Sequence, residues 1–118
     1  MKFYLDLNSK QLLVSNLALD CASLKPLKAN DTDAAKEKHV PVVEVNGSTV
    51  DVTVGTVLHP MTPEHLVTDI ILVTNKGYQV KHLTATDAPK ASFVLADGET
   101  AVAAYEYCNL HGRWVYKF

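Results

Sequence analysis

Apolar and polar side chains alternate along most of this chain, and β-branched residues fill many of the apolar positions. This two-residue period predicts β-strands, whereas the 3.6-residue period of an amphipathic helix is nearly absent. The pattern predicts strands at residues 40–45, 49–54, 66–74, 78–83, 91–95, 100–107 and 113–118. Two shorter runs, at residues 3–5 and 12–14, predict further short strands near the start of the chain.

Turn sequences separate these strands. Asn46-Gly47 predicts a tight hairpin between strands 40–45 and 49–54, and Asp97-Gly98 predicts a second hairpin between strands 91–95 and 100–107. Asn75-Lys76-Gly77 predicts the turn between strands 66–74 and 78–83. Turn sequences spaced about 8–12 residues apart are typical of an antiparallel sandwich. We therefore expect an all-β fold built around an antiparallel β-sandwich.

The start of the chain differs from the rest. Residues 28–36, KANDTDAAK, are polar and rich in alanine, and they predict a linker. The linker divides the chain into a small β-rich N-terminal segment, residues 1–36, and a sandwich domain, residues 37–118.

Composition narrows the classes of protein to consider. The formal net charge is −2 and charged residues make up 20% of the chain, so nothing favours a nucleic-acid or membrane-surface partner. No apolar run approaches the roughly 20 residues that span a bilayer. The first six residues, MKFYLD, become polar too early for a secretory signal, and we expect a cytoplasmic protein. In that compartment Cys21 and Cys108 are expected to be metal ligands or free thiols rather than a disulfide.

Three short segments hold four of the five histidines and one of the two cysteines. These segments are EKHVP at 37–41, HPMTPEH at 59–65 and CNLHG at 108–112. All three lie at the ends of predicted strands, where the loops of a sandwich gather and can converge on one metal ion. Pro60 and Pro63 fix the backbone φ angle and would hold His59 and His65 in place.

The types of ligand limit which metals such a site can bind. Imidazole binds iron, copper, zinc and nickel, and a thiolate adds soft, electron-donating character. Four histidines and one cysteine exceed the four ligands of structural zinc, but they suit a square pyramid with an open sixth position. A blue-copper electron carrier is an alternative. Its site uses one histidine upstream of the cysteine, a second histidine after it and usually a methionine further on, whereas no methionine follows His111. A structural zinc module is the other alternative, and it leaves one ligand over.

The three motifs resemble those of the superoxide reductase family, which includes neelaredoxins and desulfoferrodoxins. EKHVP, HPMTPEH and CNLHG are intact and in the family's order, and the resemblance runs from Lys36 through Trp114. It implies an immunoglobulin-like sandwich that carries one mononuclear, non-haem Fe²⁺/Fe³⁺ per chain and reduces superoxide to hydrogen peroxide. The iron ligands that it implies are four equatorial histidines and one axial cysteine: His39, His59, His65, His111 and Cys108.

The resemblance also implies roles for two charged residues beside His39. Glu37 would occupy the sixth position of the oxidised iron, and Lys38 would attract the superoxide anion and stabilise the bound product. As isolated residues, both would be read as solvated surface charges. Rubredoxin-type electron donors and homodimers are usual in the family, so we expect both for this chain.

The N-terminal segment resembles the N-terminal domain of the longer family members, without its four-cysteine iron site. Lys2–Leu5 is similar to the start of that domain and Leu24–Asn30 is similar to its end, but only Cys21 remains of its cysteines. One thiolate cannot build a four-sulfur site. We therefore expect a vestigial segment that binds no metal, with Cys21 as a free thiol.

Two further expectations concern hydrogen bonds. The backbone N–H groups of Asn109 and Leu110 are candidates to donate to the Cys108 sulfur, which would tune the metal's potential. His82, the histidine outside the three motifs, is expected to be a surface or hydrogen-bonded residue.

Overall fold

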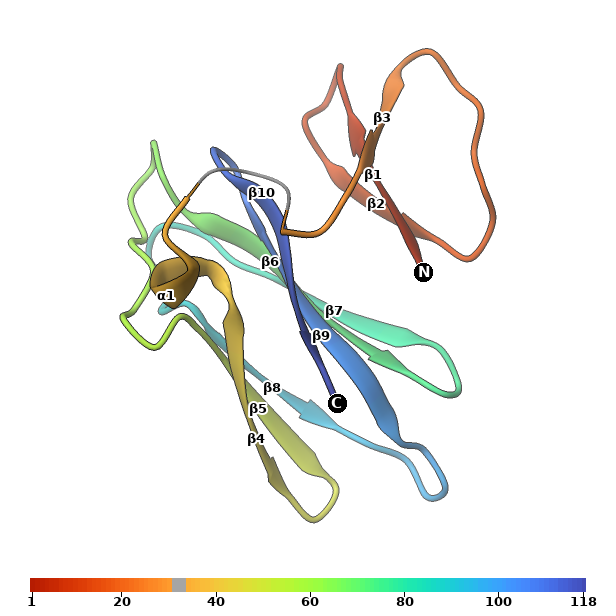
Figure 1. Cartoon of the computed structure of the whole chain (residues 1–118), viewed down its shortest axis with the longest axis vertical. Helices are drawn as coiled ribbons and strands as arrows, with labels where there is room; N and C mark the ends of the chain where they lie inside the picture. The colour runs from red at the N-terminus through yellow and green to blue at the C-terminus, as the bar shows by residue number, and fades with distance from the viewer. Residues whose placement is uncertain (31–33) are drawn as a thin grey trace.

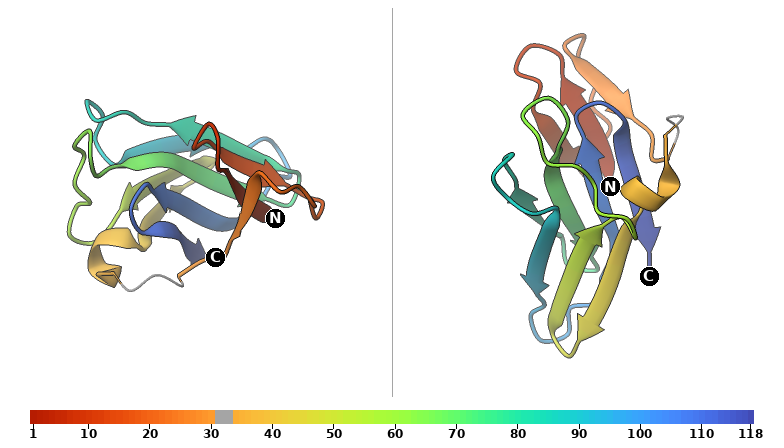
Figure 2. Two further views of the ribbon diagram at one scale, coloured as in Figure 1. Left: turned by 90° about the horizontal axis from the view of Figure 1, so that it is seen from above. Right: turned by 90° about the vertical axis from the view of Figure 1, so that its left-hand side faces the viewer.

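The structure is a computed structural model that describes residues 1–30 and 34–118, and its strands form three antiparallel sheets (Figure 1, Figure 2). One layer of the sandwich has the strand order β4-β5-β8 and contains β4 (Pro41–Asn46), β5 (Thr49–Val54) and β8 (Lys90–Val94). The other has the order β10-β9-β6-β7 and contains β6 (Val67–Thr74), β7 (Tyr78–His82), β9 (Ala101–Cys108) and β10 (Gly112–Lys117). The predicted all-β sandwich is therefore confirmed.

The core lies between these two sheets. Strand β5 buries alternate residues, as a strand with one face on a core must, and its buried side chains are Val50, Val52 and Val54. They pack in one cluster with Ile70 and Leu72 of the opposite sheet. Each such side chain contributes about 1.5–3 kcal/mol when it is fully buried.

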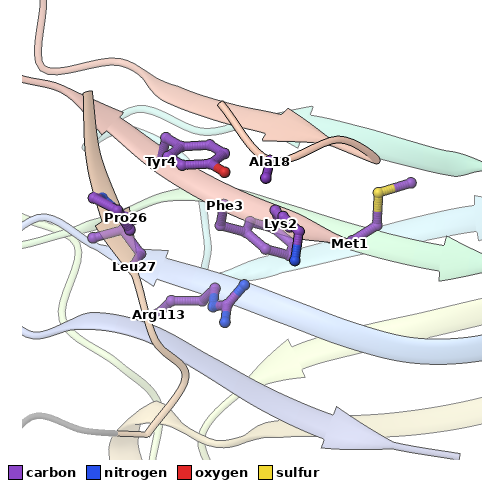
Figure 3. Close-up of a pocket in the computed structure, with 8 residues that line it drawn as sticks. All are labelled: Met1, Lys2, Phe3, Tyr4, Ala18, Pro26, Leu27 and Arg113. Atoms are coloured by element: carbon purple, nitrogen blue, oxygen red, sulfur yellow. The ribbon is translucent and has the colours of Figure 1, made fainter. Parts of the chain in front are cut away.

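A third sheet covers the outer face of the larger layer. It contains β1 (Lys2–Asp6), β2 (Leu12–Ser15) and β3 (Leu24–Leu27) in the order β2-β1-β3. The Phe3 ring lies 4.6 Å from the Tyr105 ring, and the Arg113 guanidinium lies 4.2 Å from the centre of the Phe3 ring. Figure 3 shows Arg113 next to Phe3 at this junction. Ile71 is as fully buried as its neighbours Ile70 and Leu72, so strand β6 is buried on both faces.

Strands β1 and β2 confirm the two short strands predicted near the start of the chain, but β3 was not predicted. It contains Pro26, which lacks an N–H and weakens any strand pattern in the sequence. As an edge strand of its sheet, β3 tolerates this residue.

The second predicted hairpin is wrong. Strand β8 pairs with β5, and β9 pairs with β6 and β10, so the turn at Asp97-Gly98 crosses from one sheet to the other. The Glu99 carboxylate holds this crossing, because it accepts hydrogen bonds from the Ala96 N–H at 2.9 Å and the Thr74 hydroxyl at 2.6 Å. The hairpin at Asn46-Gly47 and the turn between β6 and β7 are confirmed.

A single helical turn, α1 (Lys36–His39), precedes β4. It was not predicted, and it ends before Pro41, which disfavours helical geometry in the residue that precedes it. Residues 31–33 of the predicted linker lie outside the described residues. None of the helices in the described ranges is long and apolar enough to span a membrane.

Candidate metal centre

The motif histidines and Cys108 come from loops and element ends at one end of the sandwich. His39 ends α1, His59 and His65 lie in the connection from β5 to β6, and Cys108 ends β9. The fifth residue, His111, lies in the turn from β9 to β10. Figure 1 shows α1 next to the connection from β5 to β6.

The donor atoms of four of these residues lie within 4.8 Å of one another, and the four are His39, His65, Cys108 and His111. Nε2 of His39 lies 3.1 Å from Nδ1 of His111. Two nitrogens bound at right angles to one metal ion, each at about 2.1 Å, would be about 3 Å apart. The His39–His111 spacing therefore fits two neighbouring ligands of one ion.

His59 is outside this group of four but borders it. The centre of its ring lies 4.8 Å from that of His39 and 4.7 Å from that of His65, edge-on to both. The structure thus gathers all five residues that the sequence analysis selected as ligands.

Backbone carbonyls fix the tautomers of two histidines. Nδ1 of His39 lies 2.7 Å from the Ala35 carbonyl oxygen, and Nδ1 of His59 lies 2.7 Å from the Pro60 carbonyl oxygen. A carbonyl only accepts, so each Nδ1 carries the proton and each Nε2 keeps its lone pair. This arrangement orients a ring as a metal ligand.

Two ring nitrogens in the cluster are buried without a partner. Nε2 of His59 and Nε2 of His65 have no hydrogen bond to any described residue. An unsatisfied buried polar atom destabilises a fold by about 1–3 kcal/mol, so native proteins rarely contain one without a function. A metal ion satisfies both nitrogens, and the residues present therefore fit the iron that the motifs imply.

The electrostatics of the cluster favour neutral imidazoles. Burial and, to a smaller extent, repulsion from the neighbouring histidines lower the pKa of His59 to about 4. Burial is also the main cause of the lowered pKa of His39 and of His65. These rings are therefore neutral near pH 7, the form that binds a metal.

The Cys108 sulfur is fully buried, and burial raises the pKa of its thiol. Backbone N–H groups of Leu110 and His111 donate hydrogen bonds to the sulfur and offset part of this rise. The expected donor Leu110 is confirmed, but Asn109 is not a donor, because its N–H binds the Leu66 carbonyl at 3.2 Å instead. Metal binding to Cys108 therefore releases a proton.

The second motif folds as a tight turn. The His65 N–H donates to the Thr62 carbonyl at 3.2 Å. Pro63 is the second residue of this four-residue turn, a position that suits its fixed φ. The Thr62 N–H returns a hydrogen bond to the His65 carbonyl at 2.9 Å. His65 is thus placed by its local sequence, as the prolines of the motif predicted.

Both charged residues of the first motif are exposed and lie close to the cluster. The positive charge of Lys38 contributes to the lowered pKa of His65, and the negative charge of Glu37 opposes the fall in the pKa of His39. The Glu37 carbonyl accepts hydrogen bonds from the Thr56 hydroxyl at 3.2 Å and the Val57 N–H at 3.0 Å. The helical turn is therefore fastened to the loop that follows β5.

Gly55 permits this attachment. Its φ of +89° lies in the left-handed region, and an added Cβ would come within 2.8 Å of the Glu37 carbonyl oxygen and 2.3 Å of the Val57 carbonyl oxygen.

Sequence reasoning missed the part that three residues play at the site. Asn109 bridges to the backbone around His65, and the Trp114 indole donates to the His111 carbonyl at 3.0 Å while its ring lies 5.1 Å from that of His39.

Glu106, two residues before Cys108, is completely buried and has no hydrogen-bond partner among the described residues. Burial raises its pKa well above the ordinary value. In the sequence, Glu106 could be recognised only by its position on the buried face of β9, which is an unusual place for a carboxylate.

His82 lies away from this cluster. Its Nδ1 donates to the Asp69 carboxylate at 2.5 Å, and its side chain is largely exposed. The expectation of a hydrogen-bonded surface histidine is confirmed.

A buried cluster of imidazoles and one thiol at the rim of a β-sandwich defines a mononuclear metalloprotein. Comparison with protein families identifies the class, because the desulfoferrodoxin family model matches residues 31–117. The chain is 46% identical to a desulfoferrodoxin of Clostridium acetobutylicum over 98 residues, which are 81% of this chain and 76% of that protein. The chain belongs to the desulfoferrodoxin family.

Solved structures agree with this assignment. The superoxide reductase of Treponema pallidum is similar with a TM-score of 0.83 and 42% identity, over 98% of both chains. A 1Fe superoxide reductase of Giardia intestinalis is similar with a TM-score of 0.61 and 35% identity, over 70% of this chain and 98% of that one. The first similarity includes the N-terminal sheet as well as the sandwich.

Proposed function

We propose that this protein is a superoxide reductase, which adds one electron and two protons to superoxide and releases hydrogen peroxide. The observation that carries the proposal is the clustering of donor atoms from His39, His65, Cys108 and His111 within 4.8 Å. The similarity to two superoxide reductases supports the assignment of this cluster to iron chemistry.

One iron ion per chain would be held by five side chains, which are those of His39, His59, His65, His111 and Cys108. The free Nε2 atoms of His59 and His65 support this ligand set, and Nδ1 of His111 faces Nε2 of His39. When bound, the iron supplies the electron that superoxide accepts. The Cys108 thiolate would donate electron density to the metal, and its hydrogen bonds from Leu110 and His111 would moderate that donation.

Lys38 attracts the superoxide anion to the site. Its side chain is exposed, and its charge acts on His65, so it lies close enough to raise the local anion concentration. The same ammonium would stabilise the negative charge of the anion at the site.

Glu37 would be a further ligand of the oxidised metal. A carboxylate oxygen is a hard ligand that suits Fe(III) better than Fe(II). Because Thr56 and Val57 hold the Glu37 carbonyl, the carboxylate would have to reach the metal by rotation of the side chain rather than by displacement of the loop.

Residues 1–36 form a vestigial metal-free segment, and residues 37–118 form the iron-binding domain. Cys21 is exposed, and its Sγ lies 3.2 Å from the Ser23 hydroxyl. The chain's other cysteine, Cys108, is in the metal centre, so no second thiol can join Cys21 in a cluster. The electron for the iron therefore comes from a separate rubredoxin-type donor. We also propose that the protein acts as a cytoplasmic homodimer, since homodimers are usual in the family that it resembles.

Product analysis tests the proposed function. Iron-loaded, reduced protein is mixed with superoxide, and hydrogen peroxide and dioxygen are measured together with the spectrum of the oxidised iron. A reductase yields one peroxide per superoxide, no dioxygen and one oxidised iron. Half as much peroxide, with release of dioxygen, would instead identify a dismutase.

A further inference from the structure

A groove lies between the N-terminal sheet and the turn that carries Cys108 and His111. It has a volume of about 350 Å³ and lies along β3 and the turn from β9 to β10. Its described lining residues come from both sides: Leu5, Lys25, Pro26, Leu27, Lys28, Tyr107, Asn109, Leu110, Gly112 and Arg113.

The groove is positively charged. Lys25 and Lys28 are exposed, and no acidic residue is among the described residues that line it. The whole chain has a net charge of −2, so this surface differs in sign from the protein as a whole. Such a patch attracts a partner with an acidic face and increases its rate of association.

The wall of the groove is one hydrogen bond away from the metal-binding sulfur. Leu110 lines the groove with 58% of its surface exposed, and its backbone N–H donates to the fully buried Cys108 sulfur. An apolar side chain at the surface thus connects to the metal ligand through a single residue. A partner that covers Leu110 lies close to the metal without entering the open site.

Superoxide would approach past α1, on another side of the site. Lys38 and Glu37 belong to α1, which lies apart from β3 (Figure 1, Figure 2). A donor on the β3 side would therefore leave the approach past Lys38 open.

We propose that this groove is the docking surface for an acidic, one-electron redox protein. The proposal rests on the proposed function, because superoxide reduction oxidises the iron by one electron in each turnover. The docked partner gives one electron and is itself oxidised by one electron, and the electron enters through Leu110 and the Cys108 sulfur. No proton or atom passes between the two proteins.

Stopped-flow reduction of the oxidised protein by an acidic rubredoxin tests the surface. The docking variant is Lys25→Glu/Lys28→Glu. The control is Lys76→Glu/Lys90→Glu, which alters net charge equally at exposed lysines away from the groove. The expected result is a second-order rate at least tenfold lower at low ionic strength in the docking variant, a difference that shrinks in high salt. The control is expected to stay within about twofold of the wild type. Equal rates in the two variants would overturn the proposal.

A binding measurement gives a readout independent of turnover. Zinc-substituted rubredoxin, which is redox-inert, is titrated into the ¹⁵N-labelled protein, and the amide shifts of Lys25 and Lys28 are expected to move. Shifts confined to α1 would place the partner elsewhere. Groove shifts that depend on this protein's own concentration, without rubredoxin, would identify a second copy as the occupant.

The two proposals fail separately. Superoxide oxidation of the reduced iron needs no donor protein, so it is measured on the same docking variant. Normal oxidation with slow donor reduction supports the groove, whereas no oxidation by superoxide in the wild type would reject the proposed function alone.

Discussion

The side chain of Asn109 holds the backbone on both sides of His65. Its Oδ1 accepts a hydrogen bond from the Leu66 N–H at 3.0 Å, and its Nδ2 donates to the Glu64 carbonyl at 2.9 Å. One residue of the third motif thus orients a histidine of the second motif. The side-chain amide of Asn109 therefore links the two loops, in addition to its backbone N–H.

Replacing Asn109 by alanine is expected to weaken iron binding by about 10–100-fold, because supporting residues of a metal site have effects of that size. Loss of two hydrogen bonds also lowers the free energy of unfolding by about 1–3 kcal/mol. Competition with a chelator measures the first effect, and urea unfolding measures the second.

Asn75 offers a matched control at the other end of the sandwich. Its side chain makes the same kind of bridge, to the Thr100 N–H at 2.9 Å and the Gly98 carbonyl at 3.4 Å. Asn75→Ala is expected to lower stability without changing iron affinity. Equal losses of iron affinity in both variants would mean that Asn109 acts only through general stability.

Gly55→Ala is expected to displace the helical turn that carries Glu37, Lys38 and His39. The substitution places a methyl group against the Glu37 carbonyl and adds the strain of a positive φ, which costs about 1–3 kcal/mol. Gly98→Ala carries the strain alone, because its φ is +76° and no atom lies within 4 Å of an added Cβ. Only the Gly55 variant should lose iron affinity, and a crystal structure with α1 unmoved would contradict this prediction.

Lys38→Met is expected to slow the reaction of superoxide with the reduced iron, and the wild-type rate should fall as ionic strength rises. Lys36→Met is the matched control, since it removes the same charge from another exposed lysine of α1. Pulse radiolysis measures both rates. If the two variants react alike, the effect of Lys38 is one of net charge and not of position.

Glu99 provides a pH test away from the metal centre. Hydrogen bonds from the Thr74 hydroxyl and the Ala96 N–H lower its pKa below the ordinary value of 4.5. A lowered folded-state pKa adds stability above the unfolded-state value, and that stability is lost as pH falls through the folded-state value. Thermal unfolding of wild type and Glu99→Gln is therefore expected to differ at pH 7 and to converge in acid.

The control for this test is Glu44→Gln, which changes an exposed carboxyl on β4. Its melting temperature is expected to follow the wild type across the same pH range. A Glu99 variant as stable as the wild type at pH 7 would show that its two hydrogen bonds do not hold the crossing between sheets.

Local sequence patterns predicted the strands and identified the candidate metal-binding residues, because both alternation and the fixed φ of proline act over a few residues. The motif from His59 to His65 is an example, since Pro63 occupies a position of its turn that suits its fixed φ. The sequence did not reveal that Asp97-Gly98 crosses between sheets, because a turn sequence does not say with which strand its neighbours pair. The same limit hid the roles of Asn109 and Trp114, whose hydrogen-bond partners are set by the packing of distant segments.

The ligand set is the centre of this account, and a crystal structure of the iron-loaded protein with anomalous data at the iron edge tests it most directly. The expected result is one iron peak per chain, bound by Nε2 of three histidines, Nδ1 of the fourth and one sulfur, from His39, His59, His65, His111 and Cys108. An iron bound without Cys108, without His59, or at a second position beside Cys21 would contradict it.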